Sequence, residues 1–281
     1  MGEDNRKERF LSNEERVAFV QKKKKQSHYW KMMLSISGIL CFFISWELLT
    51  LSGIVPKQYL ASPGEIIKLF VVKINDPNPD GAVIMVNIFS SLKVSLTGFG
   101  AAVLVGVPLG WLMGWYRSID SLVNPIFEIV RPIPPVAWIP LTIVWMGVGL
   151  GAKATIVFLS AFIPCVINSY TGIRQTSEVL INVGKTCGAS DFTIFYKIGI
   201  PSAMTMTFTG LKLAIGNAWS TLVAAEMLAA TSGLGYMILQ GRNFARTDII
   251  MLGVITIGTI GTIIISLFNS LENIVLGWKK L

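Results

Sequence analysis

The sequence predicts an all-α protein embedded in a membrane, and two observations carry that prediction. Of the 281 residues, 52% are hydrophobic and only 14% are charged, and the mean hydropathy is +0.61, which is far more apolar than an ordinary soluble domain. Several apolar runs also reach the roughly 20 residues that a helix needs to cross the hydrocarbon of a bilayer. We therefore expect one bundle of membrane-spanning helices.

The positive charge of the chain is concentrated at its start and predicts its orientation. The net charge is +8, and nine of the 24 Lys and Arg residues precede residue 32. Basic residues beside a first span stay on the cytoplasmic side, so residues 1–31 are predicted to be a basic cytoplasmic tail. Within it, Lys22–Lys25 is interpreted as a solvated anchor, with contact to anionic lipid as the alternative. Residues 32–54 form the first transmembrane helix, which is retained because a long polar segment precedes it. A nucleic-acid partner is not expected.

Five further crossings follow from the apolar pattern. Residues 55–82 are predicted to be an outer loop, in which apolar residues at helical spacing indicate a short interfacial helix near Lys73. A five-helix core then covers residues 83–275. Its spans are expected near residues 92–115, 120–147, 153–174, 203–225 and 248–270. Six crossings place the C-terminus, residues 276–281, and the loop 175–201 on the cytoplasmic side together with the N-terminus.

Two local patterns describe the inside of this core. Small residues recur at every fourth position of the second span, at Gly98, Ala102, Gly106, Gly110 and Gly114. Such a stripe lets another backbone approach closely, either within the chain or at a subunit interface. In the third span, "RPIPPVAWIPL" carries four prolines that must interrupt the helical hydrogen bonds, which is tolerated only where protein or a water-filled cavity surrounds the backbone.

Catalytic and metal sites are not expected. Cys41, Cys165 and Cys187 are widely separated, and His28 is the only histidine, so neither a disulfide framework nor a metal cluster is indicated. "VLINVGKT", residues 179–186, contains G-K-T but lacks the first glycine of a phosphate loop. We therefore expect no cofactor in this chain, with ATP and Mg²⁺ bound by partner subunits, and no enzymatic activity of the chain alone.

The cytoplasmic loop carries the most informative motif, "CGASDFTIFYKIGIP", residues 187–201. It is similar to the loop of ATP-binding-cassette (ABC) importer permeases, which reads E-A-A, three variable residues, G, nine variable residues, I, one variable residue and L-P. Gly188, Ile198, Ile200 and Pro201 stand at the family spacing, whereas Asn182–Gly184 replaces E-A-A. The resemblance covers about residues 85–278 and is strongest to the branch that serves nitrate, bicarbonate, taurine and other sulfonates.

This resemblance implies the type I ABC importer permease fold and a set of partners. A second permease copy, two cytoplasmic ATPase subunits and an extracytoplasmic solute-binding protein are implied, in a bacterial inner membrane. The loop would couple the chain to the ATPase through a helix near residues 189–197, with apolar contacts from Phe192, Phe195 and Tyr196. The residues implied for coupling are Lys185, Gly188, Ala189, Ser190, Asp191, Phe192, Phe195, Tyr196, Lys197, Ile198, Ile200 and Pro201.

Charged residues inside a membrane need a partner, water or a route to the interface. Arg131 either pairs with Glu128 on the same helix face or projects toward the solute path. Glu226 is expected to stabilise the glycine-rich segment that follows it, and Lys153 to reach the interface from its span end. Cationic and amide groups suit an anion that must also be released. The candidates for the translocation path are Arg131, Pro135, Asn168, Asn217 and Trp219.

The predicted function is therefore that of a permease subunit of an ATP-driven importer for a small anion of the sulfonate or taurine, nitrate or bicarbonate type. An aromatic acid or a vitamin precursor is the alternative solute within the same family. A proton- or sodium-coupled secondary transporter is the alternative from another class, but its usual inverted repeats and midplane histidines or carboxylates are not evident.

Overall fold

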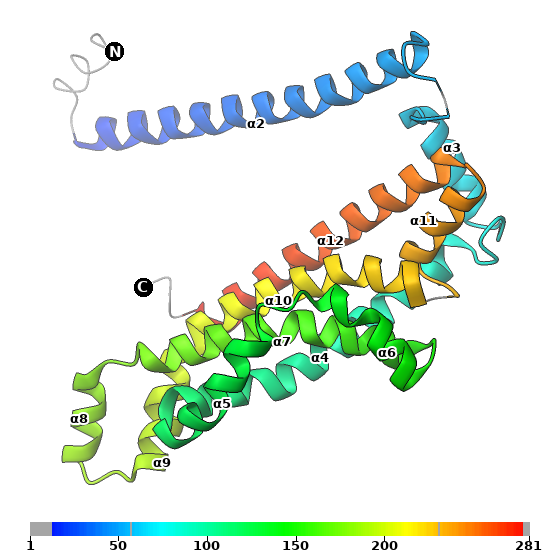
Figure 1. Ribbon diagram of the computed structural model, residues 1–281. Coiled ribbons are helices and arrows are strands. Elements are labelled where there is room, and N and C mark those ends of the chain that lie inside the picture. Colours follow the sequence, from blue (N-terminus) through cyan, green and yellow to red (C-terminus); the bar gives the residue numbers. More distant parts are fainter. Residues whose placement is uncertain (1–12, 57, 230, 278–281) are drawn as a thin grey trace. The chain divides into compact units, whose positions relative to one another are not determined.

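The computed structural model describes residues 13–56, 58–229 and 231–277, and every regular element among them is helical (Figure 1). The chain divides into two units, Met1–Glu65 and Ile66–Leu281. Residues 1–12 of the predicted tail and residues 278–281 of the predicted C-terminus lie outside the described residues.

The first unit consists mainly of helix α2 (Asn13–Leu51). The predicted limit between tail and first span falls inside this single helix, whose apolar part, Tyr29–Leu51, is long enough to cross a membrane. The helix ends three residues before the predicted end of the span. Gly53 follows with a φ of +72°, a left-handed conformation that commonly terminates helices because glycine has no Cβ.

Helix α3 (Pro63–Lys73) is the short helix expected in the outer loop. Its start is closed by reciprocal hydrogen bonds: the amide of Glu65 donates to Ser62 Oγ at 3.2 Å, and the amide of Ser62 donates to Glu65 Oε2 at 3.3 Å. This is the capping box that serine followed three residues later by glutamate favours.

Three long helices form the centre of the second unit: α4 (Ile84–Trp115), α7 (Leu150–Arg174) and α10 (Ile200–Ala229). Helix α7 packs against both others. The glycine stripe of α4 faces α7, because a Cβ at Gly110 would lie 2.5 Å from the carbonyl oxygen of Val166 and one at Gly98 would lie 2.6 Å from that of Ala154. Of the two alternatives for the stripe, packing within the chain accounts for it.

The proline-rich segment does not form one continuous helix. Helix α5 (Arg117–Val130) ends before the prolines, and the 3₁₀ turn η1 (Pro135–Trp138) leads into α6 (Ile139–Met146). The two parts are bent by 85°, since proline cannot donate to the helical ladder and restricts the residue before it. Five helices are therefore long and apolar enough to cross a membrane within the described residues, or six if the bent pair counts as one.

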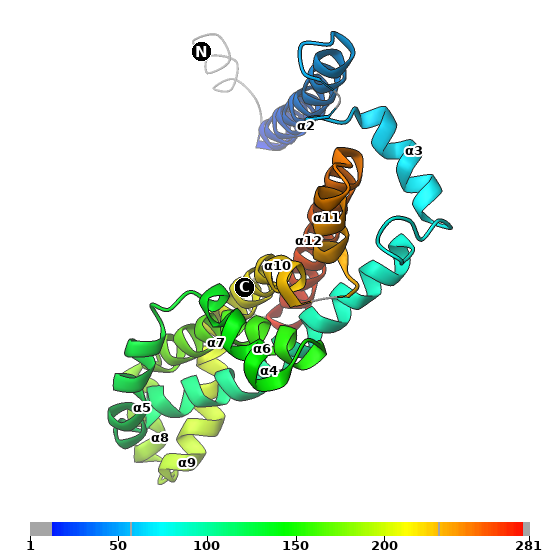
Figure 2. The ribbon, with the colours of Figure 1, turned by 45° about the vertical axis from the view of Figure 1, so that its right-hand side comes forward.

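Two groups of short helices lie at the two ends of the long ones (Figures 1 and 2). At one end are α8 (Glu178–Thr186) and α9 (Asp191–Ile194), which leads through the π-helical turn η2 (Phe195–Gly199) into α10. At the other end is α11 (Leu234–Asn243), which precedes α12 (Thr247–Val275) and packs on it and on α10. We call these the α8–α9 end and the α11 end.

Candidate functional site

The segment that carries the loop motif forms a helical hairpin at the α8–α9 end. Gly188 turns the chain between α8 and α9 with a φ of +75°, and no atom lies within 4 Å of the place that a Cβ would occupy there. Ser190 then caps α9, since its hydroxyl oxygen accepts from the amide of Thr193 at 3.3 Å. The residues of the motif therefore have distinct local roles: glycine permits the turn and serine starts the next helix.

The structure corrects the predicted limits of the coupling helix. Instead of a separate helix near residues 189–197, helical structure begins at Asp191 and continues through Pro201 into α10, giving one run from Asp191 to Leu228. Pro201 lacks the N–H that would bond to residue 197. The preceding turn widens to accommodate it, with the amide of Ile200 donating to the carbonyl of Phe195, as in the π-bulges that relieve such conflicts.

The apolar residues of this hairpin differ in exposure. Phe192 is 66% exposed and Tyr196 is 62% exposed, but Phe195 is only 6% exposed. The ring of Phe195 lies 5.5 Å from that of Trp115 and 5.8 Å from that of Tyr116. The prediction of Phe195 as a surface contact was wrong, because the end of α4 covers it; it anchors the hairpin to the bundle instead.

A polar contact and a close approach also hold the hairpin. Trp115 Nε1 donates to Asp191 Oδ2 at 3.0 Å. A Cβ at Gly184 would lie 3.1 Å from Ile194 and 3.2 Å from Ile198, so glycine at this departure from E-A-A lets α8 pack on the α9 segment. Lys185, Ser190, Lys197 and Pro201 are exposed, whereas Ala189, Ile198 and Ile200 are half-buried.

Sequence reasoning missed part of the exposed apolar surface on α8. Val179 is 69% exposed, Leu180 is 48% exposed and Val183 is 54% exposed. Their spacing, i, i+1 and i+4, places them on one helix face. This spacing is the sequence pattern that could have identified the face. Together with Phe192 and Tyr196 they form what we call the hairpin surface: Val179, Leu180, Val183, Phe192 and Tyr196.

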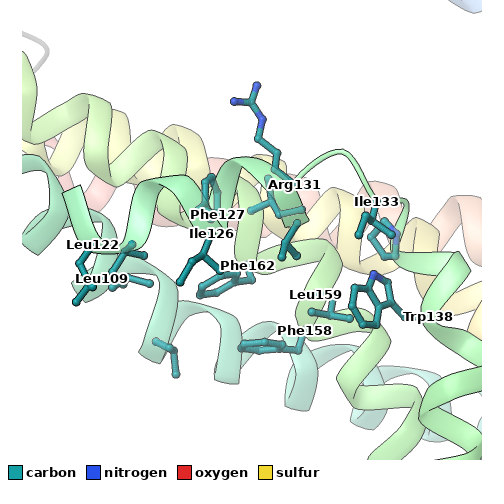
Figure 3. Close-up of a pocket in the computed structure, with 15 residues that line it drawn as sticks. Leu109, Leu122, Ile126, Phe127, Arg131, Ile133, Trp138, Phe158, Leu159 and Phe162 are labelled. Atoms are coloured by element: carbon teal, nitrogen blue, oxygen red, sulfur yellow. The ribbon is translucent and has the colours of Figure 1, made fainter. Parts of the chain in front are cut away.

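Two of the predicted path residues, Arg131 and Pro135, line one pocket of about 520 Å³ between α4, α5 and α7. Figure 3 shows that its other walls are apolar or aromatic, among them Phe127, Phe158 and Phe162, and that the Arg131 side chain points away from them. The guanidinium of Arg131 instead donates to Glu128 Oε1 at 3.1 Å. Of the two alternatives for Arg131, the ion pair is the one present.

The other three path candidates do not join this pocket. Trp219 is buried, and its Nε1 donates to the carbonyl of Ile257 at 3.0 Å. Asn168 Nδ2 donates to the carbonyl of Pro164 at 2.9 Å, while Asn217 is exposed. Helix α12 covers Trp219, and the five residues do not converge on one described cavity.

Glu226 lies at the α11 end and is fully buried. Its carboxylate accepts from Ser91 Oγ at 2.8 and 2.9 Å and from the amide of Gly235 at 2.9 Å. A Cβ at Gly233 would lie 2.3 Å from Glu226 Oε1, so only glycine fits against this carboxylate. Lys153, predicted to reach the interface, is instead buried and interacts electrostatically with Glu226.

Within the described residues, no group of His, Cys, Asp or Glu side chains is arranged to hold a metal ion. The described core is a helical bundle with several apolar spans, an exposed apolar hairpin at one end and buried polar contacts at the other. These features define a multi-span helical membrane protein.

Residues 106–278 match the family described as binding-protein-dependent transport system inner membrane component. The chain belongs to this family and is a permease subunit of an ABC transporter. The family and the all-α permease fold predicted from the sequence are both confirmed.

Similar proteins extend over most of the chain. It is 30% identical to the taurine transport system permease protein TauC of Escherichia coli, over 82% of this chain and 84% of that protein. It is also 30% identical to the nitrate import permease protein NrtB of Synechocystis, over 87% of this chain and 90% of that protein. A chain of the MetNI methionine ABC transporter, solved in inward-facing conformations, superimposes with a TM-score of 0.50 at 19% identity, covering 65% of this chain and 94% of that one. This last likeness concerns the fold alone.

Proposed function

We propose that this permease subunit imports a small anion into the cytoplasm and is driven by a separate ATPase that binds the hairpin surface. The observation that carries the proposal is that surface itself. Five apolar side chains are exposed on the helical hairpin that also carries Gly188 of the loop motif. Several exposed apolar groups gathered on one hairpin indicate an interaction site. Because this segment joins α10 directly, a protein bound there is connected to the membrane core.

The solute class rests on the relatives. TauC is named for taurine and NrtB for nitrate, and both names denote small anions or zwitterions with an anionic group. We propose a solute of the sulfonate or taurine, nitrate or bicarbonate type. The excess of positive charge in this chain, +8, is compatible with that class but does not select among its members.

The mechanism follows from the continuity of the helix that carries the loop. The helical run from Asp191 to Leu228 has 38 residues, and at 1.5 Å per residue it extends about 57 Å. A displacement of α9 by the ATPase would therefore act as a lever on the far end of α10. Two arrangements of the core helices, one open outward and one open inward, would expose the solute path to each side in turn.

The proposed assembly contains two copies of this permease, two ATPase subunits and a solute-binding protein. ATP and Mg²⁺ bind the ATPase subunits. The N- and C-termini and the α8–α9 end face the cytoplasm, which agrees with the basic residues at both ends of the chain, and the α11 end faces outward. Gly188, Asp191, Phe192, Tyr196 and Lys197 are the residues proposed to lie nearest the ATPase.

The test is ATP-driven uptake in vesicles that contain this permease, its ATPase and its binding protein. Wild type and Gly188→Asp are compared across a panel of labelled taurine, an alkylsulfonate, nitrate and bicarbonate. Gly188→Asp strains a left-handed turn in the hairpin. The matched control is Gly53→Asp, since Gly53 has nearly the same φ, +72°, equally open surroundings and a place far along the chain from the motif.

We expect wild type and Gly53→Asp to accumulate one of these anions, and Gly188→Asp to lose accumulation. Accumulation that persists without the ATPase would exclude the importer and favour a secondary carrier. If both glycine variants lose accumulation equally, the defect comes from general backbone strain, and the hairpin has no special role in coupling.

A further inference from the structure

A buried cation organises the loop that precedes α4. Lys73, the last residue of α3, is 1% exposed. Its ammonium donates to the carbonyls of Pro77, Asn78 and Ala82 at 3.1, 2.8 and 2.9 Å and forms an ion pair with Asp80. A buried charge is tolerated only when paired and hydrogen-bonded. The loop therefore closes around Lys73 and has a defined inner surface.

Asn87 connects this loop to a distant part of the chain. Its Nδ2 donates to Asp80 Oδ2 at 2.6 Å, and its Oδ1 accepts from the amide of Gly233 at 2.9 Å. The side chain is fully buried. An amide is suited to this place because it provides one donor and one acceptor at its two ends.

The same helix face also holds the start of α11. Gly233, at the N-cap of α11, contributes no side-chain cap, so the first amides need acceptors from elsewhere. Asn87 accepts from Gly233, Ser91 Oγ accepts from Leu234 at 2.9 Å, and Glu226 accepts from Gly235 at 2.9 Å. Three successive amides at the start of α11 are thus held by side chains of α4 and α10, and the negative Glu226 also favours the positive end of the helix.

The outer surface of the Lys73 loop remains open. Asn75, Pro77, Asn78 and Gly81 are exposed, while Asp80 beneath them is buried. This loop and the hairpin surface lie at opposite ends of α4, whose 32 residues extend about 48 Å. A protein that contacts the loop would therefore do so on the side of the membrane opposite the hairpin.

We propose that Asn87 is a positioning residue that couples the Lys73 loop, residues 74–83, to the start of α11. The partner is the soluble solute-binding protein, which contacts the exposed polar face of this loop, and this assignment rests on the importer proposed above. Binding at the loop shifts Asp80, and Asn87 transmits the shift to Gly233 and so to α11 and to the end of α10. Docking of the binding protein would thus change the position of one end of α10, and the ATPase would move the other end of the same helix.

The experiment uses the complete complex of permease, ATPase and binding protein in lipid nanodiscs. Hydrogen exchange is measured on the peptide that spans residues 231–237, and ATP hydrolysis is measured with and without the binding protein. Asn87→Ala removes both contacts of the relay. Asn87→Asp keeps an acceptor for Gly233 but replaces the donor to Asp80 by a second carboxylate, which repels Asp80, so it breaks the relay on the side of the loop. Ser95→Ala is the matched control, because Ser95 lies on the same helix and is buried, and its hydroxyl has no hydrogen-bond partner within the described residues.

We expect Asn87→Ala to raise exchange at residues 233–235 about tenfold, as the loss of a buried hydrogen bond predicts. Both Asn87 variants should lose the stimulation of ATP hydrolysis by the binding protein. Basal hydrolysis, which does not require a signal from the Lys73 loop, should stay within about twofold of wild type. Ser95→Ala should behave like wild type in both measurements.

Three outcomes would overturn the proposal. Unchanged exchange in Asn87→Ala means that Asn87 does not hold α11. Raised exchange with full stimulation means that the contacts only stabilise the fold. If Asn87→Ala does not assemble into the complex, Asn87→Asp decides: full stimulation of ATP hydrolysis by the binding protein in that variant rejects the relay. Failure of the importer itself is distinguishable, since the wild-type complex would then show no stimulation at all.

Discussion

The two ends of α10 are built in opposite ways. At the α11 end, Glu226 is fully buried and its carboxylate is held within the chain by Ser91 and Gly235. At the α8–α9 end, Phe192 and Tyr196 are more than half exposed, and one hydrogen bond joins Asp191 to Trp115. One helix thus joins a polar cluster closed within the chain to an apolar surface that is open.

The difference separates stability from interaction. Buried polar groups cost free energy unless all are satisfied, so the α11 end fixes a single geometry. Exposed apolar groups contribute little to the stability of the chain itself and gain free energy only when another protein covers them. Substitutions at the α11 end should therefore lower stability, and substitutions on the hairpin surface should lower binding of a partner.

The largest effect is expected for Asp80→Ala. It leaves the ammonium of Lys73 buried without its carboxylate, which typically costs about 3–5 kcal/mol of unfolding free energy. Thermal and denaturant unfolding of the permease in detergent micelles measures it. The matched variant Asp191→Ala removes an exposed carboxylate at the other end and should cost only about 0.5–1.5 kcal/mol, the net contribution of the hydrogen bond from Trp115 that it loses.

A second variant tests the cause of the Asp80 effect. Lys73→Met combined with Asp80→Leu removes both charges and should recover most of the lost stability, because an apolar pair can replace a buried ion pair. If the double variant is as unstable as Asp80→Ala, the loop geometry and not the unpaired charge is responsible.

The next effect separates two aromatic residues three positions apart. Phe195→Ala creates a cavity beside Trp115 and Tyr116 and should cost about 3 kcal/mol, whereas Phe192→Ala should be nearly neutral for unfolding. In a pull-down of the ATPase by folded permease, the order of the two variants should be reversed: Phe192→Ala should lose binding and Phe195→Ala should lose less. Equal binding by Phe192→Ala and wild type would contradict the hairpin surface as the ATPase site.

A smaller effect distinguishes two serines on one helix. Ser91→Ala removes the oxygen that accepts from the amide of Leu234 and the hydroxyl that donates to Glu226. Because both buried groups lose a partner, the variant should lower the free energy of unfolding by about 1–3 kcal/mol. Ser95→Ala removes a buried hydroxyl that has no partner among the described residues and should be neutral or stabilising. Comparable losses in both would show that burial, and not the hydrogen bonds, decides the cost.

Sequence reasoning predicted the features that are set by residues close together in the chain, such as helix breaks and helix faces. The prolines at 132–135 interrupt the third span where expected, since their effect on the backbone is local. The glycine stripe identified one face of α4 but not its partner, because periodicity does not say which helix lies opposite. Phe195 was misassigned for the same reason: its helical spacing is that of a surface residue, and Trp115, which covers it, lies on another helix far earlier in the chain.

The polar cluster at the α11 end was the least predictable part. Only Glu226 was expected to have a structural role there. Asp80, Asn87 and Ser91 lie at intervals of seven and four residues, which is helical spacing, but Asp80 precedes the helix and acquires its place through the turn around Lys73. Their partners Gly233 and Leu234 are more than 140 residues away, and no local pattern identifies such a pairing.

The smallest effect concerns Asp76, on the outer side of the Lys73 loop. Its pKa is lowered from the usual 3.8, chiefly because the amide of Asn78 donates to its carboxylate at 2.9 Å, with further help from the Asn78 side chain and from the positive charges of Lys73 and Arg246. A lowered pKa stabilises the fold above the unfolded-state value, and that contribution disappears as the pH falls through the folded-state value. Asp76→Asn should therefore lower the unfolding midpoint slightly at about pH 6, with the difference from wild type shrinking as the pH falls below 3.8. Unfolding midpoints of both proteins across this acid range measure the effect. A difference that is constant with pH would show that the carboxylate charge has no part in holding the loop, and a difference as large as that of Asp80→Ala would contradict the contrast between the exposed and the buried side of this loop.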